Sequence, residues 1–135
     1  MDDIRLLTTE KVTINVNTVD LGYIDMLIAE GHFATRTEFV KYAVKSQLES
    51  QNNSIERTLT HYEERGRKVY VGMARFNHAD LEEIIARGEQ LDVVVVGLLS
   101  VSSDVSLDLI ERAVNSITVY GVCRCREEIK VHYKL

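Results

Sequence analysis

The segment Lys11-Val12-Thr13-Ile14-Asn15-Val16-Asn17 alternates polar and apolar side chains. Alternation with a period of two is typical of a half-buried β-strand, with one apolar face and one face in water. No second strand pattern occurs in residues 1–52. An unpaired strand exposes its backbone donors and acceptors, so a second copy of the chain is its natural partner. We therefore expect an antiparallel two-stranded ribbon shared by a dimer.

Two helices are expected after this strand. Thr18 is placed to cap the first, and Asp20 lies in its first turn, where the helix dipole favours an acid. Gly31 is the expected C-terminal stop. The spacing of its apolar residues predicts one buried stripe, which consists of Leu21, Ile24, Leu27 and Ile28.

The second helix has a clear start in Thr35-Arg36-Thr37-Glu38. This is the capping-box pattern, in which the Thr hydroxyl accepts from a free amide and the Glu side chain reaches back to the cap residue. A second apolar stripe follows, made of Phe39, Val40, Ala43, Val44 and Leu48.

Together, the strand and helices of residues 10–50 resemble the ribbon-helix-helix DNA-binding proteins of the Arc, MetJ and CopG type. The resemblance implies a ribbon that enters the major groove, with outward strand residues on base edges and a phosphate at the second helix's N-terminus. The base-reading residues would be Lys11, Thr13 and Asn15, and the phosphate-binding residues would be Thr35, Arg36 and Thr37. The chain departs from the family at Thr13, Asn15 and Asn17, where relatives often carry Arg, Lys or Pro.

Composition limits the classes of protein that fit. The chain has 135 residues, 45% of them hydrophobic, and a formal charge of −5, so it can bury a core but offers no broad basic surface for nucleic acid. No apolar stretch approaches the roughly 20 residues of a membrane span, and Asp2 and Asp3 do not fit a signal peptide. We expect a cytoplasmic protein without a membrane partner.

A polar run, Ser50-Gln51-Asn52-Asn53-Ser54, separates two differently patterned parts of the chain. Residues 54–66 have Ile55, Leu59 and Tyr62 at helical spacing, with Ser54 as cap and Gly66 as stop. We expect a ribbon-helix-helix domain over residues 1–52, a helical linker over 53–67 and a third part over 68–135.

The third part contains a weak repeat of strands that each hold a glycine. Gly72, Gly97 and Gly121 lie 25 and then 24 residues apart, and helices are expected over residues 80–90 and 105–116 between them. The β-α-β-α-β order favours parallel strands joined by crossover helices. Two architectures fit, a short solenoid similar to leucine-rich repeats and a small open α/β sheet; the repeat is preferred. The glycines are expected to allow close packing.

Candidate chemistry in the third part is sparse. Cys123 and Cys125 lie too close in sequence for an ordinary structural disulfide, and with His132 they do not match a zinc spacing, so both are expected as small buried side chains. His78 is expected near a helix start, and Glu82-Glu83 on a solvated helix face. No nucleophile pattern is present in the sequence, so we expect no enzyme, metal or cofactor.

The sequence thus predicts an α+β ribbon-helix-helix domain joined to a small α/β domain with parallel strands. Its expected function is sequence-specific DNA binding by a homodimeric transcriptional regulator, a repressor. The residues 68–135 would form tetramers or sense a small-molecule effector. The alternative is an assembly protein that uses the ribbon only to dimerise.

Overall fold

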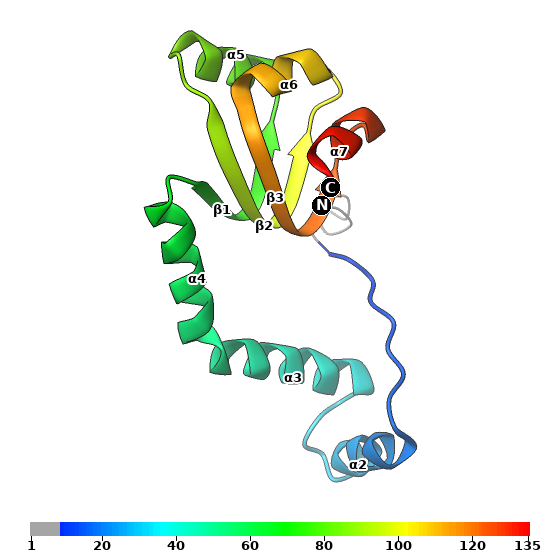
Figure 1. The fold of residues 1–135 in the computed structure, drawn as a ribbon. Coiled ribbons are helices and arrows are strands. Elements are labelled where there is room, and N and C mark those ends of the chain that lie inside the picture. Colours follow the sequence, from blue (N-terminus) through cyan, green and yellow to red (C-terminus); the bar gives the residue numbers. More distant parts are fainter. Residues whose placement is uncertain (1–8) are drawn as a thin grey trace. The chain divides into compact units, whose positions relative to one another are not determined.

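The computed structural model describes residues 9–135. These residues divide into two compact units, one formed by Lys11–Thr58 and one that contains Leu59–Leu135 together with Glu10. Six helices and three strands lie within the described residues (Figure 1). The fold is therefore mixed α and β, as the sequence predicts.

Two helices make up most of the first unit. Helix α2 spans Thr18–Ala29 and α3 spans Arg36–Ser50. Gly31, with φ of 85°, lies in the turn between them, in the left-handed conformation that ends helices and that glycine adopts without strain. Residues 9–17 form no helix or strand in the single chain, so the ribbon stays a prediction about two chains.

Helix α4 spans Asn52–Glu64 and begins two residues before the predicted cap at Ser54. Gly66, with φ of 80°, follows its end, as predicted. Near its C-terminus, the hydroxyls of Tyr62 and Tyr120 share a hydrogen bond, and the Arg67 guanidinium lies 5.5 Å from the centre of the Tyr62 ring. The hydrogen bond between the two tyrosines attaches the end of α4 to the third strand.

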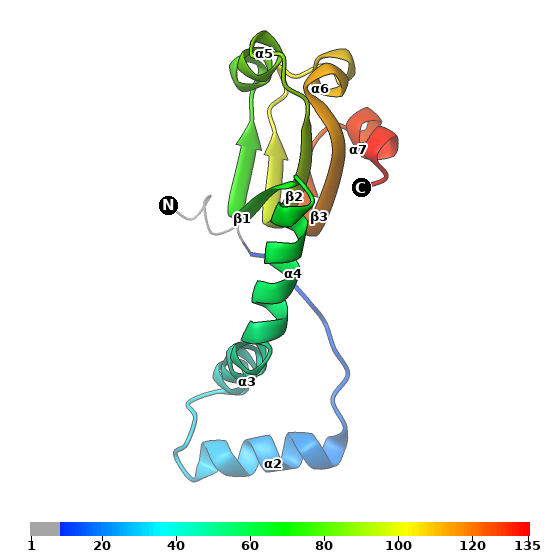
Figure 2. The same cartoon turned by 60° about the vertical axis from the view of Figure 1, so that its left-hand side comes forward.

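The second unit is built on a parallel sheet. Strands β1 (Lys68–Phe76), β2 (Leu91–Val101) and β3 (Val114–Arg124) lie in the order β1-β2-β3. Helices α5 (His78–Ala86) and α6 (Leu107–Ala113) connect them and lie side by side in both ribbon views (Figures 1 and 2). The predicted β-α-β-α-β order is confirmed, but both helices are shorter than the predicted 80–90 and 105–116.

The core of this unit lies between the sheet and the helices. The middle strand is its centre, since Val93, Val94 and Val95 are fully buried, as expected for a strand covered on both faces. Leu81 of α5 and Ile110 of α6 are also fully buried against the core.

The three strand glycines lie at one level of the sheet, because Gly72 pairs with Gly97 and Gly97 with Gly121. Their φ angles are 109°, 131° and 128°. A Cβ on Gly97 would lie 2.1 Å from the carbonyl oxygen of Gly72, and one on Gly121 would lie 2.0 Å from that of Gly97. The predicted close packing is confirmed, and it occurs between neighbouring backbones.

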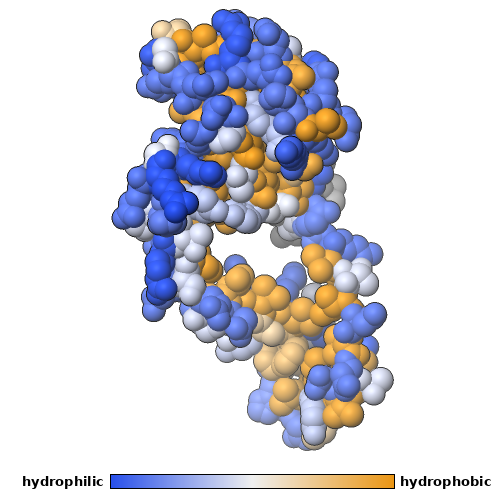
Figure 3. All heavy atoms as spheres, viewed as in Figure 1, coloured by the Kyte–Doolittle hydropathy of each residue, from blue (hydrophilic) through white to orange (hydrophobic). Residues whose placement is uncertain are grey.

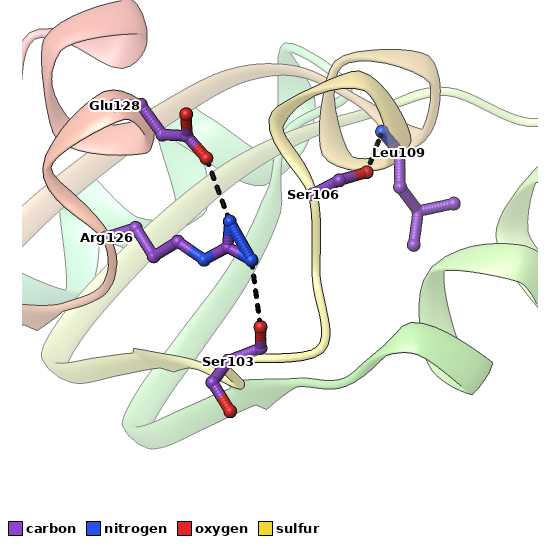
Figure 4. A network of polar contacts seen from close by, with 5 residues as sticks. All are labelled: Ser103, Ser106, Leu109, Arg126 and Glu128. Atoms are coloured by element: carbon purple, nitrogen blue, oxygen red, sulfur yellow. Dashed lines mark hydrogen bonds and ion pairs between the residues drawn. The ribbon is translucent and has the colours of Figure 1, made fainter.

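A last helix, α7 (Glu127–Tyr133), was not predicted. Ile129 of this helix is fully buried, and the Tyr133 hydroxyl donates to the carbonyl oxygens of Ile110 and Val114 at 3.2 and 2.6 Å. Arg126, just before the helix, donates to the carbonyl of Ser103 at 3.0 Å and pairs with Glu128 (Figure 4). The short helix is therefore anchored at both ends.

Candidate nucleic-acid interface

The three expected base-reading residues lie in the extended segment before α2. Lys11, Thr13 and Asn15 are exposed. The apolar residues between them are exposed too, with 79% of Val12, 62% of Ile14 and 39% of Val16 accessible. Both faces of this segment are therefore open to solvent in a single chain, including the face that its pattern assigns to a core.

Asn17, not Thr18, caps the helix that follows this segment. The Asn17 Oδ1 accepts hydrogen bonds from the amides of Val19 at 2.8 Å and Asp20 at 3.4 Å. The predicted cap at Thr18 is wrong by one residue, because Asn17, just outside the helix, places its side-chain oxygen within reach of these two amides. Asn17 thus fixes where the extended segment ends.

The N-terminus of α3 carries the expected phosphate-binding residues. The Thr35 Oγ1 accepts from the Glu38 amide at 3.1 Å, so Thr35 is the cap, as predicted. Glu38 reaches back to the amide of Ala34 at 2.8 Å, not to that of Thr35, which corrects the expected capping box by one residue. The amides of Arg36 and Thr37 are in the first turn, where a helix offers free donors to an anion.

The Arg36 side chain is engaged by an acid on the preceding helix. Its Nε and Nη2 donate to the two carboxylate oxygens of Asp25 at 2.9 and 2.8 Å. This hydrogen bond lowers the pKa of Asp25 and raises that of Arg36. Both side chains remain about half exposed, so this contact through two hydrogen bonds, the Arg36–Asp25 fork, is accessible to a competing anion.

Apolar side chains gather on the surface of α2 and α3 (Figure 3). Of the two helices, only Ile24 is buried. A cavity of about 280 Å³ lies beside it, lined by Asp20, Tyr23, Ile24, Leu27 and Phe39. Exposed large residues of this surface include Val19, Met26, Tyr42, Val44 and Leu48. The first predicted stripe is therefore buried or half-buried, whereas Val40, Val44 and Leu48 of the second are exposed.

The profile of the Ribbon-Helix-Helix transcriptional regulator family matches residues 7–130 of the sequence. The chain belongs to this family. This confirms the resemblance drawn from residues 10–50 and extends it over the sheet. The family is one of transcriptional regulators and not a class of enzymes, which supports a DNA-binding regulator.

One curated relative of this ribbon-helix-helix protein is an uncharacterised protein of Methanocaldococcus jannaschii. It is 44% identical over 39 residues, which cover 29% of this chain and 40% of the relative. The chain thus spans two-fifths of the length of this relative. No solved structure matches the chain.

The Asp25–Arg36 contact of this ribbon-helix-helix protein was not predicted from its sequence. Eleven positions separate the two residues, and no periodic pattern reports a pair that bridges two helices across a turn. In the sequence, Asp25 is only one of several charged residues of the first helix. The Asp25 carboxylate nevertheless binds the Arg36 guanidinium and so competes with any other anion for it.

Other candidate chemistry lies outside this interface. In the part of the chain that the structure describes, no three His, Cys, Asp or Glu side chains gather into a metal-binding group. His78 is the first residue of α5, as predicted, and pairs with Glu82, while His132 pairs with Glu111. No helix among residues 9–135 is long and apolar enough to cross a membrane.

Proposed function

We propose that this chain is a homodimeric, sequence-specific DNA-binding repressor of the cytoplasm that reads the major groove with a two-stranded ribbon. The observation that carries the proposal is the exposure of Val12, Ile14 and Val16. A second copy of residues 11–17 would bury these side chains and satisfy the free backbone groups. The opposite face of the same ribbon then carries Lys11, Thr13 and Asn15 outward.

The proposed roles follow from the chemistry of these side chains. Lys donates to guanine, Asn pairs with adenine through two hydrogen bonds, and Thr contacts either. The amides of Arg36 and Thr37, with Thr35 as cap, would hold a phosphate and set the position of the ribbon. An occupied operator blocks transcription, which is why we assign repression.

We propose three parts for this function, with residues 1–52 as the DNA-binding domain, 53–67 as linker and 68–135 as a repeat-like domain that assembles dimers into tetramers. The two open edges of the parallel sheet support the assignment of residues 68–135 to assembly. Strands β1 and β3 have no further strand beside them among residues 9–135, and open strand edges favour pairing with another copy. Binding of a small-molecule effector is the second role considered for this domain.

Selection from random duplex DNA tests the proposal. We expect the full chain to enrich a short site that occurs as an inverted or tandem repeat. Asn15→Ala should lose preference at one base position, at a cost of about 1–3 kcal/mol against the preferred base. The matched control is Asn53→Ala, an exposed Asn of α4, which should leave the selected sequence unchanged.

A chain that dimerises but enriches no sequence would overturn the proposal and favour an assembly protein. The two outcomes are separable because sedimentation reports dimerisation without DNA. A monomeric chain at high concentration would exclude both functions, since each requires the ribbon to be shared.

A further inference from the structure

Two thiols lie in contact where the last strand ends. Cys123 belongs to β3 and Cys125 follows that strand's last residue. Their Sγ atoms are 3.2 Å apart and share a hydrogen bond. Both side chains pack against the core, but they are half-buried and not buried as predicted. Packing alone does not require the two sulfurs to meet.

The backbone on either side of the pair is fixed. Cys123 is paired with Leu99 of the middle strand, and Arg124 with Ser100. After Cys125, Arg126 is held by the carbonyl of Ser103 (Figure 4). The two sulfurs are therefore held in contact by their surroundings, and a disulfide requires them to approach by only about 1 Å.

The two thiols have different surroundings. Cys123 lines a cavity of about 470 Å³, whose lining also includes Lys130 and Lys134. Within residues 9–135, neither lysine forms an ion pair with a carboxylate, so both bring positive charge to the cavity lining. Cys123 is therefore placed to react with a small oxidant from solvent.

Cys125 is not among the residues that line this cavity. Burial and the hydrogen bond shared with Cys123 raise the pKa of the Cys125 thiol to about 12. Lys130 acts against this increase and Glu127 adds to it. Cys125 therefore stays protonated until its neighbour has reacted. The pair combines a thiol that lines a cavity with a second thiol in contact with it, as in thiols that are oxidised in two steps.

We propose that Cys123 and Cys125 form a reversible redox site, which a hydroperoxide converts into an intrachain disulfide. The Cys123 thiolate attacks one peroxide oxygen, the O–O bond breaks, and the leaving hydroxide takes a proton to become water. The Cys125 sulfur then attacks the sulfenic sulfur of Cys123, and the departing hydroxide takes the Cys125 proton. Two thiols and hydrogen peroxide give one disulfide and two waters.

The short ring makes this bond different from a structural disulfide. A bridge between residues two positions apart is strained, and strained, exposed disulfides are the ones that thiols reduce readily. This agrees with the expectation that the pair forms no ordinary structural bridge. The reaction is independent of DNA binding and would occur in a chain that binds no DNA.

Peptide mapping of the full chain tests the proposal. The reduced protein is treated with hydrogen peroxide, its remaining thiols are alkylated under denaturing conditions, and trypsin is added. We expect Ala113–Arg124 joined to Cys125–Arg126 by a disulfide, or an uncut Ala113–Arg126 peptide lighter by two hydrogen atoms. Both alkylation sites should be lost together and return after treatment with dithiothreitol.

Two variants separate the roles of the thiols. In Cys125→Ser, Cys123 should accumulate as a sulfenic acid that dimedone traps, with little adduct in the unsubstituted chain. In Cys123→Ser, Cys125 should remain open to alkylation after peroxide. Circular dichroism of both variants establishes that they are folded.

Three results would overturn the proposal. These are full alkylation of both thiols after peroxide, disulfides only between chains, and over-oxidation of Cys123 while Cys125 still accepts the alkylating reagent.

Discussion

Replacing Gly97 by Ala should strongly destabilise the sheet, and the structure gives the size of the effect. The φ of 131° at this residue is a conformation that costs a side-chain-bearing residue about 1–3 kcal/mol. The added Cβ would also lie 2.1 Å from the Gly72 carbonyl oxygen, which belongs to the neighbouring backbone. Relief of this overlap moves β1 away from β2 and weakens at least one or two ladder hydrogen bonds, each worth about 1 kcal/mol. The expected loss is about 2–5 kcal/mol.

Two other glycines provide matched controls. Gly72 has φ of 109° but nothing within 4 Å of an added Cβ, so Gly72→Ala should cost only the conformational part, about 1–3 kcal/mol. Gly22 lies inside α2, also with nothing within 4 Å, and Gly22→Ala should stabilise that helix by about 0.5–1 kcal/mol.

The assay is urea denaturation at one fixed protein concentration, followed by circular dichroism. Hydrogen exchange at β1 and β2 amides assigns the change to the sheet. If Gly97→Ala costs no more than Gly72→Ala, the backbone overlap does not control stability, and the reasoning is refuted.

Further predictions concern the interface and assembly. Asp25→Asn should release the Arg36 guanidinium and tighten binding to all DNA sequences alike, with a steeper salt dependence; unchanged binding in filter assays would exclude a phosphate role for that side chain. The fork's contribution to stability is present above the ordinary carboxyl pKa of 3.8 and is lost as the pH falls through the lowered pKa of Asp25, so acid titration of Asp25→Asn should lack this step. Ile14→Pro should abolish dimerisation in sedimentation, since proline removes a ladder amide; a dimer of normal affinity would contradict the ribbon. Light scattering should report a tetramer for the full chain and a dimer after removal of residues 68–135, whereas dimers in both cases would favour an effector-binding role.

The order of elements in the sheet could be predicted because its signals are local. The Val93–Val96 run is too apolar for a strand with one solvent-exposed face. The recurrent glycines mark equivalent positions in the three strands. Helix α7 was missed because its cap residue, Arg126, makes no side-chain cap hydrogen bond and the helix has only seven residues. Its stability comes from tertiary contacts that no local pattern encodes.

The local geometry of the candidate interface could be predicted only in part. Thr35 was identified because capping follows a short local rule, whereas the Arg36–Asp25 fork depends on how two helices meet. The sulfur contact had a visible signal, since alternate residues of a strand share a face. What the sequence lacked was the end of β3 at Arg124, which places the second thiol just beyond the ladder.

The alignment of the three glycines has a consequence for insertions and deletions in relatives of this chain. Strands β1 and β2 keep one offset of 25 residues throughout their pairing, such as Gly72 with Gly97. Between β2 and β3 the pairing shifts after Leu91 and Val114, so that Asp92 lies opposite Ser116 and Asn115 is left over. Asn115 donates to the Asp92 carboxylate at 2.9 Å, and this hydrogen bond stabilises the extra residue at the bulge. We therefore expect changes of chain length in the helical connections or at this bulge. One residue gained or lost between the bulge and Gly121 would move a side chain onto the Gly97 carbonyl.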